Sequence, residues 1–291
     1  MYNKILVPLD GSKLAEAVLP YVRWLADRLH LPVALLHVHD PETVSPSLHP
    51  TRAADYLQQT ATSYLNDLTV SCAVKTGSAP EAILDTTSAD AGTLIAMATH
   101  GQTGSGRWLL GRVAQKVLQA SNQPLMLIRP QQDNLRSDAR LGTILVPLDG
   151  SSLAEQILPH VAYLAMHLGL QVVLIRTYML PAASYFLAAH LAPPDLTVLR
   201  EKCAKEIGDY LQAKANELKG KGVEQVTFVV AEGSGAEGVI DLARKTSGSM
   251  VAMSSHGRSG MGRWVLGSVT DRVVSHCGEP VLVIRPARSS T

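Results

Sequence analysis

The sequence contains the same eight residues twice, as Ile5-Leu6-Val7-Pro8-Leu9-Asp10-Gly11-Ser12 and as Ile144-Leu145-Val146-Pro147-Leu148-Asp149-Gly150-Ser151. These two segments lie 139 residues apart (149 − 10). Late in each half, His100-Gly101 recurs as His256-Gly257 and Ile128-Arg129-Pro130 recurs as Ile284-Arg285-Pro286, both at an offset of 156 residues (256 − 100). A repeat of this length indicates a tandem duplication, whose second copy holds 17 additional residues (156 − 139).

The repeats divide the chain into two predicted domains, residues 1–130 and 141–291. Between them lies a polar and charged stretch, residues 131–140, that is typical of a linker. A length of 291 residues fits two domains of ordinary size.

Each predicted domain alternates short apolar runs with amphipathic stretches. Apolar runs separated by helices are typical of parallel sheets that are covered on both faces. The pattern therefore predicts the α/β class, with two tandem doubly wound, five-stranded parallel-sheet domains. The expected strands are 5–7, 32–38, 70–75, 93–98 and 125–129 in the first domain and 144–146, 171–177, 225–231, 250–254 and 281–285 in the second.

Helical spacing follows the first strand of each domain. Ser12 is a suitable N-cap, and after it apolar residues recur at Leu14, Val18, Val22, Leu25 and Leu29. The second domain repeats this stripe at Leu153, Ile157, Val161, Leu164 and Leu168. Pro20 and Pro159 lie inside the stripes, so we expect a kink in each helix. Further helices are expected at 56–68 and 196–218.

Composition excludes several classes of protein. The net charge is +1 and aromatic residues make up 4% of the chain, which argues against a nucleic-acid partner. No stretch is long and apolar enough for a membrane span, and the N-terminus lacks the pattern of a secretory signal. No metal-ligand spacing relates the three cysteines, Cys72, Cys203 and Cys277, so we expect no metal site. Three cysteines cannot all pair in disulfides, so we expect a cytoplasmic protein.

Two segments of each domain are expected to meet at the carboxyl edge of its sheet, where open α/β sheets bind ligands. They are the Pro-Leu-Asp-Gly-Ser turn and the glycine-rich stretch after the fourth strand, residues 254–268 in the second copy. Gly267-Ser268 opens the next amphipathic stretch, so the free N–H groups of a helix N-terminus would face the site. Such a site favours phosphate, and Ser268, Arg258 or Arg263 can add a hydroxyl or a positive charge.

Simpler interpretations exist for the same residues. Glycines cluster in ordinary loops, Asp149 can be a turn or capping residue, and His100 and His256 can be structural rather than catalytic. We predict no catalytic residues, because no Ser/His/Asp or Cys/His arrangement accompanies these histidines. The Walker pattern of P-loop enzymes is absent.

The chain resembles the universal stress protein family in both halves. The family hallmark is Gly-x2-Gly-x9-Gly-Ser/Thr after the fourth strand, with an aspartate just after the first. The second copy gives Ser254-x2-Gly257-x9-Gly267-Ser268 with Asp149, and differs only at the first glycine. The first copy gives Ala98-x2-Gly101-x9-Gly111-Arg112 with Asp10, and differs at both ends of the motif.

The resemblance implies a Rossmann-like fold of the adenine nucleotide alpha hydrolase type, and ATP, with or without magnesium, as the ligand. It implies that Asp149 contacts the ribose, that Gly257, Gly267, Ser268 and Val269 hold the phosphates, and that Pro147, Thr177 and Met253 line the base. Ser254 and Arg258 complete the candidate site of the second domain. The corresponding candidates in the first domain are Pro8, Asp10, Val38, Met97, Gly101 and Gly111.

The resemblance implies a nucleotide-dependent regulator of the stress response. Fast hydrolysis needs an oriented water, a base and usually a metal clamp. Asp149 is the one carboxylate that the sequence places in the pocket, so we expect slow hydrolysis or none. The alternatives are a structural assembly protein without nucleotide and a weak ATPase or nucleotide-transferring enzyme.

Arg112 distinguishes the first copy, because it replaces a small hydroxyl residue at the first turn of the helix. Its side chain can fold into the phosphate pocket and fill it, or it can swing outward and pair with a phosphate. We expect an impaired first site and binding mainly in the second domain.

Two further features concern contacts outside the pockets. The additional residues of the second copy are expected within the apolar segment 178–195, as packing, as a lid over the second site or as a contact with another chain. Family members pair through their last strands, so 124–129 and 280–285 are expected to pair within this chain as an internal pseudo-dimer. A homodimer of two chains is a further possibility.

Overall fold

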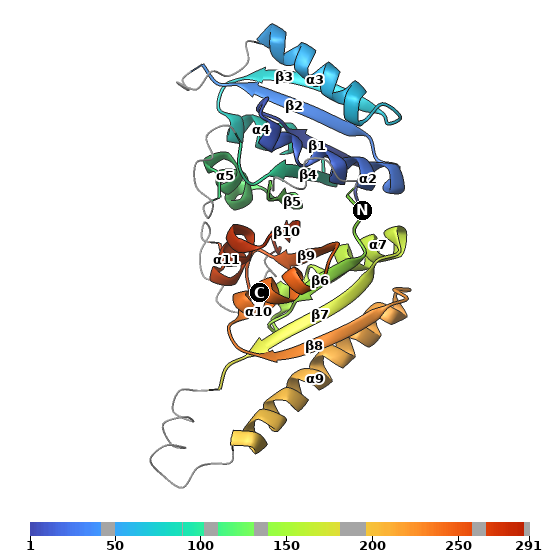
Figure 1. Cartoon of the computed structure of the whole chain (residues 1–291), viewed down its shortest axis with the longest axis vertical. Coiled ribbons are helices and arrows are strands. Elements are labelled where there is room, and N and C mark those ends of the chain that lie inside the picture. The colour runs from blue at the N-terminus through green and yellow to red at the C-terminus, as the bar shows by residue number, and fades with distance from the viewer. Residues whose placement is uncertain are drawn as a thin grey trace.

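The computed structural model describes residues 1–41, 50–88, 90–101, 110–130, 139–180, 196–257 and 266–287. Its described strands form one sheet in the order β3-β2-β1-β4-β5-β10-β9-β6-β7-β8 (Figure 1). The strands of the first half are β1 (Lys4–Pro8), β2 (Val33–His39), β3 (Val70–Thr76), β4 (Thr93–Ala98) and β5 (Leu125–Ile128). Those of the second half are β6 (Thr143–Pro147), β7 (Gln171–Tyr178), β8 (Val226–Glu232), β9 (Ser249–Ser254) and β10 (Val281–Ile284).

Helices cover both faces of this sheet and create two separate apolar cores. One core contains residues of α1 (Lys13–Glu16), α2 (Leu19–Leu29) and α3 (Pro50–Tyr64), with their counterparts α6 (Ser152–Glu155), α7 (Leu158–Leu168) and α9 (Leu196–Gly220). The other contains residues of α4 (Ala79–Ser88), α5 (Arg112–Ala120), α10 (Gly235–Lys245) and α11 (Ser268–His276). The predicted doubly wound α/β fold is therefore confirmed in each half.

The two halves join through their last strands. β5 and β10 pair antiparallel, with Val281 opposite Leu127, Leu282 opposite Met126 and Val283 opposite Leu125. All four residues of each of these strands are buried. An unpaired apolar strand at the edge of a sheet promotes aggregation, and this pairing removes one such edge from each half. The pairing is the one that the family resemblance implies for an internal pseudo-dimer.

The helix after the first strand differs from the prediction in each half. Instead of one kinked helix there are two helices, α1 and α2 in the first half and α6 and α7 in the second, and each proline is the second residue of the later helix. Proline lacks the N–H of a helix interior but is well tolerated in the first turn, so it starts the second helix. The break also changes the buried face, because Leu14 is exposed.

Other differences are small and have local causes. α3 begins at Pro50 and ends at Tyr64, earlier at both ends than the predicted 56–68. β3 lies at the edge of the sheet and most of its residues are exposed, so it is not covered on both faces as the apolar pattern suggested.

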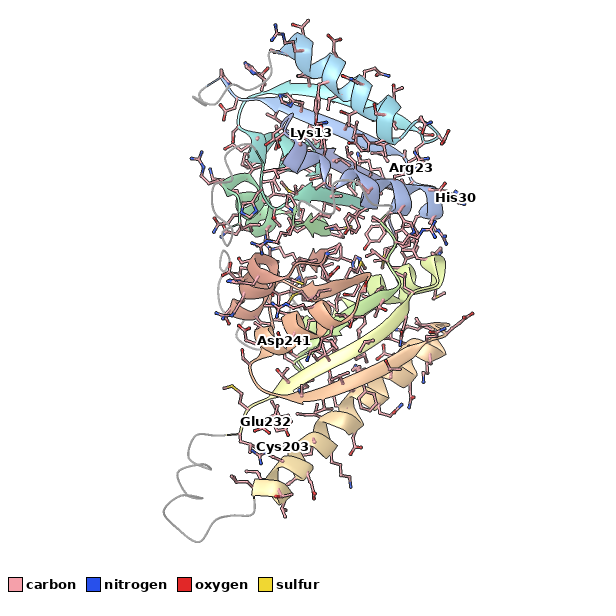
Figure 2. The ribbon with its side chains drawn as sticks, viewed as in Figure 1. Lys13, Arg23, His30, Cys203, Glu232 and Asp241 are labelled. Carbon is pink, nitrogen blue, oxygen red and sulfur yellow. The ribbon has the colours of Figure 1, made fainter. Side chains whose placement is uncertain are left out.

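In the second half, an ion pair of 2.9 Å between Arg200 of α9 and Glu232 at the end of β8 joins these elements. Figure 2 shows Glu232 beside the part of α9 that carries Cys203.

Some predicted features lie outside the described residues. They are most of the linker, residues 131–138, the apolar segment 181–195, and the glycine-rich segments 102–109 and 258–265, the last of which contains Arg258 and Arg263. Within the described part of the chain, no helix is long and apolar enough to cross a bilayer.

A second contact between the halves involves the N-terminal segment and α7. The Tyr2 hydroxyl lies 2.9 Å from Nδ1 of His160, and the Tyr2 ring packs edge-on against Tyr163 with ring centroids 5.5 Å apart. Burial raises the pKa of Tyr2, so its hydroxyl stays protonated beside the imidazole. Burial, and then the N-terminal amino group, lower the pKa of His160 from its ordinary value of 6.5.

This contact predicts a loss of stability in acid. Because the pKa of His160 is lower in the folded chain than in the unfolded chain, the unfolded chain takes up a proton first as the pH falls below 6.5. The free energy of unfolding is therefore expected to decrease from that pH downward, until the folded chain is protonated too. Urea unfolding between pH 7.5 and pH 5 measures this decrease. His160→Asn removes the titration and should flatten the profile, whereas the control His30→Asn, at the exposed end of α2 (Figure 2), should not. Equal slopes in both variants would contradict the assignment.

Candidate functional site

Two matching pockets lie at the carboxyl ends of the strands, one in each half. The first has a volume of about 210 Å³ and the second about 200 Å³. All six candidates predicted for the first domain line the first pocket: Pro8, Asp10, Val38, Met97, Gly101 and Gly111. Nine of the candidates for the second domain line the second: Pro147, Asp149, Thr177, Met253, Ser254, Gly257, Gly267, Ser268 and Val269. The tenth, Arg258, is outside the described residues.

An aspartate packed on a glycine forms the centre of the second pocket. Asp149 Oδ1 accepts hydrogen bonds from the backbone N of Ser151 at 2.9 Å and from its hydroxyl at 2.6 Å. Its other oxygen, Oδ2, would lie 2.2 Å from a Cβ atom added to Gly257. A side chain at position 257 would therefore displace the carboxylate. The first pocket repeats this arrangement, with Asp10, Ser12 and a distance of 1.9 Å at Gly101.

The helix that follows each glycine-rich segment begins at its pocket. Gly267 is the N-cap of α11, and its N–H donates to the carbonyl of Ser255 at 3.0 Å. A Cβ at Gly267 would lie 3.1 Å from that carbonyl oxygen, so the close approach favours glycine. Gly267 has no side chain with which to cap α11, the part of the chain that the structure describes gives its start no side-chain cap, and Ser268 in its first turn is exposed. The first N–H groups of the helix can therefore donate to an anion in the pocket.

The apolar end of the second pocket lies between β7, β9 and α10. Thr177 packs against the start of α10, where a Cβ at Gly238 would lie 2.7 Å from Thr177 Cγ2. Met253 is buried, and Pro147 at the end of β6 is partly buried. This end of the pocket is therefore lined by apolar walls and strand ends.

The hydroxyl of Ser254, at the position of the first hallmark glycine, donates to the carbonyl oxygen of Ala154 at 3.4 Å. The backbone carbonyl of Ser254 accepts from the Thr270 hydroxyl at 3.0 Å, which ties the first turn of α11 to the end of β9. The first copy has Ala98 and Ala114 at these two positions and lacks both hydroxyls.

The first pocket differs from the second in its charges. Arg112 lines it but is an exposed residue, and the pocket is as large as its counterpart, so of the two alternatives for this side chain the structure does not have the one in which it fills the pocket. Burial, and then the nearby Arg129 guanidinium, lower the pKa of His100, which favours the neutral imidazole. His37 occupies the position on β2 that Arg176 occupies on β7.

Sequence reasoning missed several residues that line the second pocket, chiefly Arg176, Gly235 and Val239. The guanidinium of Arg176 packs on Gly150, where a Cβ would lie 2.7 Å from Nη1, and it stacks at 5.0 Å on the ring of Tyr210. The Tyr210 hydroxyl donates to Glu155 at 2.9 Å, which extends the contact to α6. The strand pattern gave no signal for Arg176, because neighbouring residues of a strand point to opposite faces of the sheet and its neighbour Thr177 was already a candidate.

The comparison with known proteins agrees with this geometry. A model of the universal stress protein family matches residues 1–129 and 141–285. The chain belongs to the universal stress protein family. This universal stress protein is 25% identical over 303 residues to a universal stress protein of Mycolicibacterium smegmatis, covering 97% of each chain.

Solved structures show the same fold over the whole chain. The crystal structure of a universal stress protein from Archaeoglobus fulgidus matches with a TM-score of 0.66 and 18% identity, covering 99% of this chain and 100% of that one. A putative universal stress protein from Pseudomonas aeruginosa matches with a TM-score of 0.68 and 17% identity, covering 98% of this chain and 94% of that one.

Proposed function

We propose that this chain is a cytoplasmic, ATP-binding universal stress protein that acts as a nucleotide-dependent regulator and binds ATP mainly in its second domain. One observation carries the proposal: the Asp149 carboxylate packed on Gly257 and the uncapped start of α11 face the same pocket. A nucleotide presents a ribose diol and a phosphate chain, which match a carboxylate acceptor and helix N–H donors.

The proposed roles follow the two ends of the pocket. Asp149 accepts from the ribose hydroxyls, while Gly267, Ser268 and Val269 offer backbone N–H groups, and Ser268 a hydroxyl, to the phosphates. Pro147, Thr177 and Met253 form the walls around the base. Two features support a stronger second site: the Ser268 hydroxyl, and the hydrogen bond from Thr270 to Ser254 that joins the first turn of α11 to the end of β9.

We propose slow hydrolysis or none. Among the described residues that line the second pocket, Asp149 is the only carboxylate, and its Oδ1 already accepts two hydrogen bonds from Ser151. A general base for water would have to come from another group. Slow ATPase activity and an assembly protein without nucleotide are the outcomes that would replace this proposal.

Gly257→Ala tests the central contact of the site. The added Cβ would meet Asp149 Oδ2 at 2.2 Å and displace it, so the affinity for ATP should fall by about tenfold or more. Isothermal titration calorimetry with ATP and magnesium measures the change. Gly220→Ala is the matched control, because no atom lies within 4 Å of the added Cβ at the end of α9, and it should leave the affinity unchanged. Equal affinities in the two variants would contradict the site.

Arg112→Ser tests the difference between the two pockets. The substitution gives the first pocket the hydroxyl that Ser268 gives the second, so the bound nucleotide should rise from about one toward about two per chain. Equilibrium dialysis with labelled ATP measures this ratio. An unchanged ratio would show that Arg112 does not impair the first site, and a lower one would mean that it pairs with phosphate.

A further inference from the structure

Two arginines connect the halves of the chain at the β5–β10 pairing. Arg129 directly follows β5, and its Nη1 donates to the carbonyl oxygen of Ser275 in the last turn of α11. Arg285 directly follows β10, and its Nη1 lies 3.4 Å from the carbonyl oxygen of Gln119 and 3.5 Å from that of Ala120 in the last turn of α5. Each arginine therefore binds the C-terminus of a helix that belongs to the other half.

These contacts have a clear electrostatic cause. The last carbonyl groups of a helix have no partners within the helix and carry a partial negative charge. A guanidinium placed there satisfies one or two of them and interacts favourably with the helix dipole. The antiparallel pairing of β5 with β10 brings the end of each strand beside the helix that precedes the other strand, which makes the two contacts reciprocal.

The opposite ends of the same two helices line the pockets. Gly111 and Arg112 at the start of α5 line the first pocket, and Gly267 and Ser268 at the start of α11 line the second. Each helix has nine residues, which corresponds to about 13 Å. We expect so short a helix to shift as a rigid element, so that a change at its N-terminus reaches its C-terminal carbonyls.

Each arginine is also attached to the pocket of its own half. The residue before Arg129, Ile128, accepts through its carbonyl from the backbone N of Thr99 at 2.8 Å, and Thr99 immediately precedes His100 and Gly101 of the first pocket. Ile284 before Arg285 accepts in the same way from Ser255 at 2.8 Å, next to His256 and Gly257 of the second pocket. Arg129 also lies close enough to His100 to lower its pKa, after the larger effect of burial.

We infer that Arg129 and Arg285 couple the two pockets, so that a nucleotide bound in one changes the affinity and the order of the other. The inference rests on the proposed function. An anion at the start of α11 fixes the helix. The C-terminal carbonyls of α11 then hold Arg129. Together with Ile128, Arg129 holds the Thr99–Gly101 segment of the first pocket. Arg285 provides the same connection from the second pocket to α5. Both are positioning residues.

Hydrogen exchange on the full chain tests the inference when ATP occupies the second pocket and the first pocket is disabled. Gly101→Ala places a Cβ 1.9 Å from Asp10 Oδ2 and disables that pocket, so ATP in this background binds only the second. We expect exchange of the amides in residues 99–101 and 112–120 to slow by at least about fivefold when ATP saturates the second pocket. Adding Arg129→Gln and Arg285→Gln should abolish this distant protection while ATP still protects the start of α11.

Two further variants separate coupling from a general structural role. Arg129→Lys with Arg285→Lys retains the positive charge at the helix ends and should restore part of the distant protection. Lys219→Gln also removes a cation from the last turn of a helix, α9, and should have no effect on the first pocket.

The outcomes distinguish the inference from the proposed function. Protection confined to the second pocket in the Gly101→Ala chain, or distant protection that survives both glutamine substitutions, would overturn the coupling but leave ATP binding in place. Absence of ATP binding in both this chain and the parent chain would overturn the proposed function and the coupling together. The affinity provides a second measurement. In an Arg112→Ser chain, calorimetry should show that ATP bound in one pocket changes the affinity of the other pocket for ATP. Replacing Arg129 and Arg285 by glutamine should make the two affinities independent.

Discussion

The antiparallel pairing of β5 with β10 determines how this universal stress protein is built. Both strands have four residues, all buried, and each would be an exposed apolar edge if its half stood alone. Their pairing joins two five-stranded sheets into one and places Arg129 and Arg285 at the helix ends of the opposite half. The duplicated chain thus satisfies within itself a contact that would otherwise require a second molecule.

The two pockets share one design and differ in detail. In both, an aspartate held by a serine packs on a glycine that has no space for a side chain, and a nine-residue helix starts at the pocket. The second copy adds the hydroxyls of Ser254, Ser268 and Thr270, whereas the first has Ala98, Arg112 and Ala114 there. These substitutions change the hydrogen-bond donors of the site while its volume stays nearly the same. The two pockets therefore present different hydrogen-bond donors on the same fold.

Much of this arrangement could be predicted from the sequence because the signals are local or repeated. The exact repeat around Asp10 and Asp149, and apolar runs such as Thr93–Ala98, which matches β4 in full, predicted the strands and the pocket edges. The prediction that Leu14 belongs to the buried stripe was wrong, because Pro20 starts a second helix whose buried face does not continue that of the first. Arg176 was missed because its place beside Gly150 depends on tertiary packing against Tyr210, which no local pattern encodes. The contacts of Arg129 and Arg285 likewise depend on how the halves meet.

The nucleotide content of the purified chain tests the central claim most directly. Denaturing the protein and quantifying the released nucleotide by chromatography, against the protein concentration, gives the number of occupied pockets. We predict about one adenine nucleotide per chain, held in the second domain and able to exchange with added ATP. No released nucleotide, together with no binding when ATP and magnesium are added, would contradict it and favour an assembly protein without a nucleotide.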